Sequence, residues 1–445
     1  MKTSQLSLDQ APPEDIPFRY LLTGPFFGVL AGVFLVVYGE RLFITAWSLK
    51  TVALVHTMTL GWLALIMMGA FYQMVPVLVG GHVKGIFISR NNYFVLVAGI
   101  FSLVIGFNFW ITTWLYLAVP LLSLGFCLFI GQLSFTLFGI KALKPVVYAL
   151  RLSIISLALT ATFGILMIGM MYGWWELDVD RVIFKNIHMV SGLIGWIGFL
   201  LFGVAFHVIP MFYLTEAFSE KIAKWILLLM VYGIIQLIAG FTFTLSFTLL
   251  LVCAIPVYLA VSLFIFIVTK LIYQRQRKLV DTTLRFWQLG LISLVLAFVL
   301  LPFNSYRMDE VFSYLFATVF ILGFAVAITN GMLYKIVPFL IWLHRFSALV
   351  GKVKTPTMKE IVPDSPARKQ FYLFVLCLLI LLFNSVYPND IAIRIGGVLW
   401  ILSNAIIIFC LFKAISIKPP EAPPTVSEDD FAAMFANLPP VEPSK

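Results

Sequence analysis

Long apolar stretches alternate with short polar loops along most of the chain, from Tyr20 to Phe412. Each stretch has about twenty residues or more with few charges, which is the length that a helix needs to cross roughly 30 Å of hydrocarbon. Lipid offers the backbone no hydrogen-bond partners, so such stretches are expected to be helical. The pattern predicts twelve spans, at 18–38, 51–79, 92–108, 113–138, 150–172, 186–214, 223–242, 246–270, 284–303, 311–341, 370–386 and 392–413.

Three stretches, 92–140, 225–269 and 370–388, carry no acidic or basic residue apart from their flanks, so each must fold as a tight helical hairpin. The turns of these hairpins are expected near Asn108, Gly240 and Pro388. The two ends of the chain are polar. Residues 1–17 lack the apolar core and cleavage site of a signal peptide and form a short N-terminal segment. Residues 415–445 are rich in proline and acid and predict a disordered tail, which leaves 18–414 as the membrane domain.

One sixteen-residue pattern occurs three times, in GWLALIMMGAFYQMVP, GWIGFLLFGVAFHVIP and GFAVAITNGMLYKIVP. The first glycines of the copies are 134 and 128 residues apart, which is the length of four spans with their loops. We therefore predict an all-helical membrane fold of three pseudo-repeats, at about 18–140, 150–270 and 284–413. The shared positions of the motif are Gly61, Gly69, Pro76, Gly195, Gly203, Pro210, Gly323, Gly331 and Pro338.

The motif falls on spans two, six and ten, where its glycines allow a neighbouring backbone to come close. These spans are the expected inner, pore-lining trio, and the closing proline is expected to end or kink each helix. The polar residue of each copy is Gln73, His207 or Lys335. Equivalent repeats place the three at one depth near the cytoplasmic face. They either satisfy freed carbonyls and snorkel, or form a path for protons or ions.

Composition agrees with this picture, since 62% of the 445 residues are hydrophobic, 11% are charged and the mean hydropathy is +1.03. The net charge of +10 follows from lysine and arginine in the loops after even-numbered spans, which predicts that these loops and both termini are cytoplasmic. A bacterial inner membrane is the expected location. The lipid bilayer accounts for the positive charge without a nucleic-acid partner. The opposite loops contain Arg41, Lys50, Arg181, Lys185, Arg307 and Arg394.

Two of the five histidines, His56 and His188, begin inner spans on the same, extracytoplasmic side. They could be the axial ligands of a b-type haem, or hold copper together with sulfur from Met58 or Met189. They could also simply hydrogen-bond across a helix pair. His207 cannot join them, because nineteen residues at 1.5 Å each place it about 28 Å from His188. The four cysteines lie inside spans, without the spacing of a metal site.

The segment HTMTLGWLALIMMGAFYQMVP, from His56 to Pro76, resembles the second helix of the nitric oxide reductase branch of haem-copper oxidase subunit I. The resemblance implies that His56 is an axial haem ligand, and that His188 stands where the family has a copper-ligating histidine. The family's other ligands have no counterpart, since 223–242 and 311–341 contain no histidine and His344 lies beyond them. A complete haem–copper centre is therefore not expected, and the incomplete ligand set argues against terminal oxidase activity.

Three kinds of function remain open at this stage. The chain could bind haem, with copper as a further possibility, and serve electron transfer, nitric oxide or gas handling, or oxidase maturation beside an electron-transfer or assembly partner. It could instead be a permease that carries a small solute, a metal ion or protons past Gln73, His207 and Lys335. A scaffold without either activity is the third. We find no phosphate loop, nucleophile elbow or zinc-protease motif in the sequence.

Overall fold

The fold is given by a computed structural model that describes residues 12–79, 83–141, 144–307 and 310–420. Most of the predicted N-terminal segment, most of the predicted tail and His82 lie outside the described residues. Within them, twelve helices are long and apolar enough to cross a membrane, so the predicted all-helical fold with twelve spans is confirmed. Each predicted span coincides with one of these helices, with ends that differ by a few residues.

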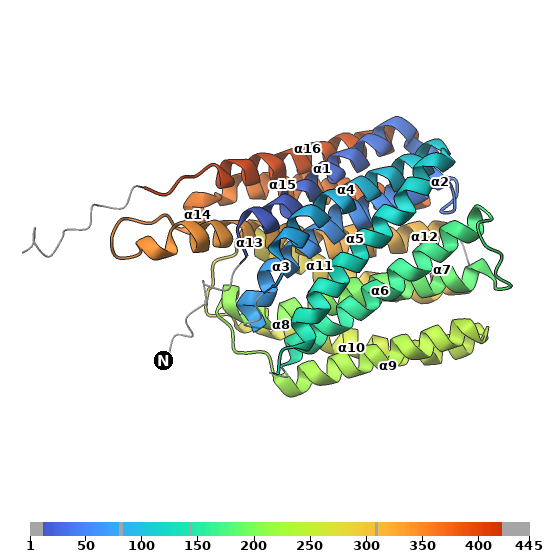
Figure 1. Cartoon of the computed structure of the whole chain (residues 1–445), viewed down its shortest axis with the longest axis horizontal. Helices are drawn as coiled ribbons and strands as arrows, with labels where there is room; N and C mark the ends of the chain where they lie inside the picture. The colour runs from blue at the N-terminus through green and yellow to red at the C-terminus, as the bar shows by residue number, and fades with distance from the viewer. Residues whose placement is uncertain (1–11, 80–82, 142–143, 308–309, 421–445) are drawn as a thin grey trace, which may run out of the picture.

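The helices run nearly parallel in one elongated bundle (Figure 1). Nine spans are made by a single α-helix, whereas spans two, six and ten each join two α-helices. A short helix, α14 (Met358–Ile361), precedes span eleven. In chain order the spans are α1 (Asp15–Tyr38), α2 (Leu49–His56) with α3 (Leu65–Val79), α4 (Ile86–Phe109), α5 (Thr112–Phe138), α6 (Pro145–Met171), α7 (Arg181–Met189) with α8 (Phe199–Tyr213), α9 (Glu220–Thr242), α10 (Phe247–Gln274), α11 (Thr282–Arg307), α12 (Glu310–Ala317) with α13 (Ala327–Arg345), α15 (Asp364–Val386) and α16 (Asp390–Ile415).

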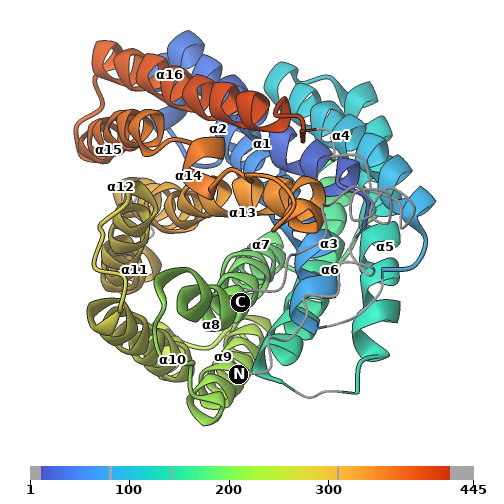
Figure 2. The same ribbon diagram turned by 90° about the vertical axis from the view of Figure 1, so that its left-hand side faces the viewer.

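The three expected hairpins are present as α4 with α5, α9 with α10, and α15 with α16, and the helices of each pair pack on one another. Their connections follow Phe109, Thr242 and Val386, within three residues of the predicted turns. The first and last spans, α1 and α16, also pack side by side and close the outer ring of helices (Figure 2). The chain therefore returns to its starting point around the bundle.

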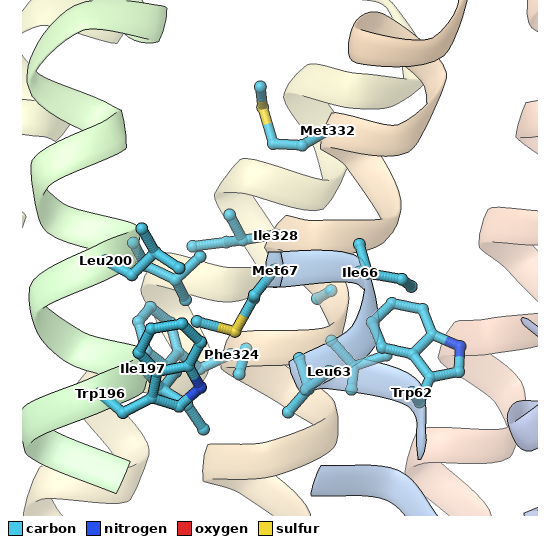
Figure 3. Packing of buried hydrophobic residues seen from close by; sticks show 14 of the residues in the cluster. Trp62, Leu63, Ile66, Met67, Trp196, Ile197, Leu200, Phe324, Ile328 and Met332 are labelled. Carbon is cyan, nitrogen blue, oxygen red and sulfur yellow. The ribbon is translucent and has the colours of Figure 1, made fainter. Parts of the chain in front are cut away.

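Spans two, six and ten are the inner helices, as predicted. In their most apolar windows 67%, 72% and 61% of the residues are buried, whereas the values for the other nine spans lie between 28% and 56%. Their shared interior is packed with apolar side chains, among them Met67, Leu200 and Ile328 (Figure 3). These side chains are at most 4% exposed. The trio therefore meets in a close-packed core.

Each inner span changes from α-helix to π-helix and back at the same place in the motif. The π-helical segments are Thr57–Ala64, Val190–Gly198 and Thr318–Val326, and each contains the first glycine of its copy. A π-helical turn has a wider hydrogen-bond ring than an α-turn, is rare, and occurs frequently at functional sites. The sequence motif therefore carries a shared backbone feature as well as shared residues.

The motif glycines also pack against the preceding outer helix in the same way in all three copies. A methyl group added to either glycine would overlap a side chain on that helix, and the two side chains concerned are seven residues apart each time. Close approach of backbones is the main way in which apolar helices associate in lipid. The glycine contacts are Gly61 with Phe27, Gly69 with Tyr20, Gly195 with Ser156, Gly203 with Ala149, Gly323 with Ser293 and Gly331 with Phe286.

The closing prolines do not end the helices. Pro76, Pro210 and Pro338 lie inside α3, α8 and α13, and each helix continues for at least three residues beyond its proline. Of the two outcomes predicted at each proline, the end of the helix is therefore wrong, whereas the kink stays a prediction. Nearby polar groups and a helix end can accommodate the lost hydrogen bond in a membrane protein.

Candidate functional site

The two histidines that begin the inner spans come together at the predicted extracytoplasmic end of the bundle. His56 is the last residue of α2 and directly precedes a π-helical segment. His188 lies near the end of α7, two residues before the next π-helical segment. The centroids of the two imidazole rings are 6.2 Å apart, and their planes are inclined by 28°. The two residues are 132 positions apart in the sequence.

Both rings are held by the same kind of hydrogen bond. Nδ1 of His56 lies 2.8 Å from the carbonyl oxygen of Val52, and Nδ1 of His188 lies 2.8 Å from that of Thr160. A carbonyl oxygen can only accept, so Nδ1 carries the hydrogen in each ring and donates it. Nε2 is then left with its lone pair. Within the described residues no hydrogen bond occupies Nε2 of either histidine.

This arrangement is the one that metal-ligating histidines adopt. Their second ring nitrogen usually donates to a carbonyl or carboxylate, which fixes the tautomer and makes the ligating nitrogen more basic. A metal between two Nε2 atoms would place the ring centres about 6 Å apart, with roughly 2 Å for each metal–nitrogen bond. An offset aromatic pair can have a similar spacing. The free Nε2 lone pairs are what favours ligation, because stacking would not require them.

The environment of the two rings is largely apolar. His56 contacts the ring of Phe107 on α4, with 5.9 Å between centroids. Gly164 on α6 makes room for His188, because a Cβ atom at this position would lie 3.0 Å from Cε1 of the imidazole. Span three and span five therefore enclose a pair of ligand candidates that spans two and six supply. An apolar shell of this kind limits solvent access to a bound cofactor.

The two methionines that could complete a copper site lie in different surroundings, and such a site stays a prediction. Met58 is buried but lines a separate cavity of about 100 Å³ towards Tyr314. Met189 is 38% exposed. Residues two apart on a helix point in widely different directions, which accounts for the separation of Met58 from His56. Within the described residues no group of three or more histidine, cysteine or acidic side chains could hold a metal ion.

A site with two imidazoles suits haem better than a bare ion. Copper and zinc sites usually need three or four protein ligands, whereas the porphyrin supplies four nitrogens itself and leaves two axial positions for the protein. His56 and His188 match that requirement in number and in tautomer. The two imidazoles, from spans two and six, therefore suit a bis-imidazole haem in number and in tautomer.

The three polar residues of the motif lie in three different environments. Gln73 is 1% exposed, and neither its oxygen nor its nitrogen has a hydrogen-bond partner in the described part of the chain. His207 on α8 is exposed. Lys335 is buried and forms an ion pair with Asp281 at 2.7 Å. Because the three side chains differ in burial and one is already paired, a shared polar ring stays a prediction.

Asp281 is the partner that sequence reasoning missed. It directly precedes α11, and its Oδ1 accepts hydrogen bonds from the Thr283 hydroxyl and from the backbone of Leu284, as a helix-capping aspartate does. Burial raises the pKa of its carboxyl, but the hydrogen bond and the charge of Lys335 outweigh this and lower the pKa overall. An acid just before an apolar span was the available signal, although it did not name Lys335.

The comparisons with known proteins add no family. Neither a scan against protein-family models nor a search of curated proteins finds a match to this chain. The resemblance to haem-copper oxidase subunit I therefore remains a proposal that rests on the residues. The candidate function of the His56–His188 site therefore rests on the geometry of its residues.

Proposed function

We propose that this membrane protein binds haem b between His56 and His188 and transfers electrons at the predicted extracytoplasmic side of the bundle. The observation that carries the proposal is the matched state of the two imidazoles. They are 6.2 Å apart, each donates Nδ1–H to a backbone carbonyl, and each keeps the Nε2 lone pair for a ligand. A chance contact between two half-buried histidines does not require the same tautomer in both.

A haem in this position would supply a one-electron redox couple. The protein would contribute both axial ligands, orient them through the carbonyls of Val52 and Thr160, and exclude water with apolar neighbours such as Phe107. A haem held by both His56 and His188 would have no free coordination position for a gas molecule. Among the functions that the sequence left open, the geometry therefore supports electron transfer better than binding of nitric oxide or oxygen.

This function is compatible with a degenerate relative of haem-copper oxidase subunit I. The inner spans two, six and ten are present, whereas span seven contains no histidine and span ten contains only His344, in its last turn, so the family's ligands for a second metal centre do not occur. Such a protein would exchange electrons with a partner, or assist the assembly of an oxidase, in the inner membrane of a bacterium with both termini cytoplasmic. Terminal oxidase activity has no support in its ligand set.

The permease alternative gains little from the structure. The part of the interior that Figure 3 shows is packed with apolar side chains, although the inner spans also bury the polar residues Gln73, Asn330 and Lys335. Lys335 is already paired with Asp281. A transport path along the bundle axis would need these side chains to rearrange. We therefore keep haem binding as the proposed function.

The test is an absorption spectrum of the full-length protein, purified in detergent from haem-replete cells. We expect a Soret band and sharp α and β bands on reduction, together with about one haem per chain by pyridine haemochrome assay. His56→Ala and His188→Ala should each remove most of the haem, because a single imidazole binds it more weakly. His207→Ala is the matched control, since it removes a histidine from the same span at the opposite end.

Each outcome bears on the proposal. Loss of haem from both site variants with retention in His207→Ala would support it. A colourless wild-type preparation that elutes as a single folded species would refute it, and so would equal haem content in wild type and His188→Ala. Haem that is retained in His56→Ala but binds carbon monoxide would show that this residue occupies an axial position.

A further inference from the structure

A second site lies at the other end of the bundle, in a cavity of about 230 Å³. It is formed by the end of α8, the segment between α10 and α11, α13, and the region from α14 to the start of α15. On the predicted topology this is the cytoplasmic end. The cavity is independent of the proposed haem, which would bind at the opposite end of spans two and six.

Five charged side chains line this cavity, and the two acids among them are already engaged. Asp281 accepts a hydrogen bond from Nζ of Lys335 at 2.7 Å, and Asp364 accepts one from the backbone nitrogen of Thr282 at 3.0 Å. Asp364 keeps its negative charge, but three basic side chains against two acids leave the wall with one net positive charge. Neither Arg277 nor Lys359 forms an ion pair within the described residues.

Lys335 can donate hydrogen bonds into the cavity even while it is paired with Asp281. Its ammonium group has three N–H donors, of which Asp281 takes one, and its Nζ lies 6.0 Å from the centre of the Tyr213 ring. Its side chain is 11% exposed and lines the cavity, so it is not sealed off. The wall thus combines two cations that lack an acidic partner with spare donors from a third.

We propose that this cavity binds a phosphate group, with Arg277 and Lys359 as its charge partners and Lys335 as a donor from α13. Arginine recognises phosphate through paired hydrogen bonds, and basic pockets between helices at the cytoplasmic surface bind anionic lipid headgroups. The volume equals that of about eight water molecules at roughly 30 Å³ each, so the phosphate and part of its parent molecule can enter. Apolar wall residues such as Phe212 and Val362 suit a ligand with an uncharged portion.

The experiment has two arms, which separate the two sources of a phosphate group. In the first, inorganic phosphate is titrated into the detergent-purified full chain by calorimetry. In the second, the chain is placed in nanodiscs of phosphatidylcholine with or without phosphatidylglycerol, and bound lipid is counted by native mass spectrometry. Saturable binding in the first arm identifies a soluble phosphate compound, and selective retention of phosphatidylglycerol in the second identifies a lipid headgroup.

Arg277→Gln and Lys359→Gln test the assigned residues without breaking the Lys335–Asp281 pair. We expect Arg277→Gln to weaken binding roughly tenfold or more, because it removes a charge-assisted contact. Lys278→Gln is the matched control, since this exposed neighbour does not line the cavity. Binding in neither arm would overturn the proposal, as would binding that Arg277→Gln and Lys278→Gln reduce equally.

Discussion

Lys335 on α13 and Asp281 before α11 form an ion pair in which Nζ and Oδ2 are 2.7 Å apart and both side chains are nearly buried. The pair joins the start of span nine to the third inner span, at the predicted cytoplasmic end. Two charges taken out of water are costly, and their attraction offsets that cost only while both are present. Removing one partner should therefore harm the fold more than removing both.

We expect Lys335→Met to lower the free energy of unfolding by about 3–5 kcal/mol, because Asp281 is left as a buried, unpaired charge. The double variant Lys335→Met with Asp281→Asn should recover most of this loss, since asparagine keeps an oxygen for the backbone of Leu284. The measurement is denaturant-induced unfolding in mixed micelles. The exposed Lys352→Met serves as the control, and a double variant no more stable than the single one would contradict the coupling.

The same pair predicts a dependence on pH. The pKa of Asp281 is lower in the folded protein than its ordinary value near 3.8. A lowered carboxyl pKa contributes stability that is complete above the unfolded pKa and is lost as the pH falls through the folded pKa. We therefore expect the melting temperature of the wild type to fall more steeply below about pH 4 than that of the double variant. Parallel curves would show that the pair does not titrate as described.

The motif glycines predict a packing effect that can be tested with one methyl group. In Gly203→Ala the new Cβ would overlap Cβ of Ala149, which cannot move away by rotating. We expect a destabilisation of about 1–3 kcal/mol from overpacking. Gly131→Ala is the matched control, because a Cβ at Gly131 on α5 meets nothing within 4 Å. It should be neutral or slightly stabilising, since alanine favours a helix more than glycine does.

A variant that leaves both histidines in place can test the haem site. Gly164→Leu puts a large side chain against the His188 ring, where even a Cβ atom would lie 3.0 Å from Cε1. The ring should be displaced, and we expect the haem content per folded chain to fall several-fold in the pyridine haemochrome assay, with Gly131→Leu unaffected. Unchanged haem content and an unchanged reduction potential in Gly164→Leu would mean that His188 is not held as a ligand.

The spans and their order could be read from the sequence with good accuracy. Lipid forces every crossing segment to satisfy its own backbone hydrogen bonds, so length and hydropathy suffice to place helices such as α5 and α10. The repeated glycines also indicated which spans are inner, because only small residues permit the close contact that Gly203 makes with Ala149. Helix ends were less certain, and the prolines that were expected to end or kink their helices lie inside them.

The candidate sites depended on contacts that no local pattern encodes. That His56 and His188 begin inner spans on one side was visible in the sequence. Their separation, their shared tautomer and the supporting carbonyl of Thr160 follow only from how spans two, five and six pack. Likewise, His207 and Lys335 occupy the same motif position, yet one is exposed and the other is paired with Asp281.

The sequence by itself thus determined the membrane class, the twelve helices and the inner trio, because the solvent imposes these on each segment separately. Only the tertiary structure decided which polar side chains meet, where the cavities lie and which prolines stay within a helix. These depend on the rotation and depth of each helix against its neighbours. Packing between segments more than a hundred residues apart sets that rotation, and no single segment contains it.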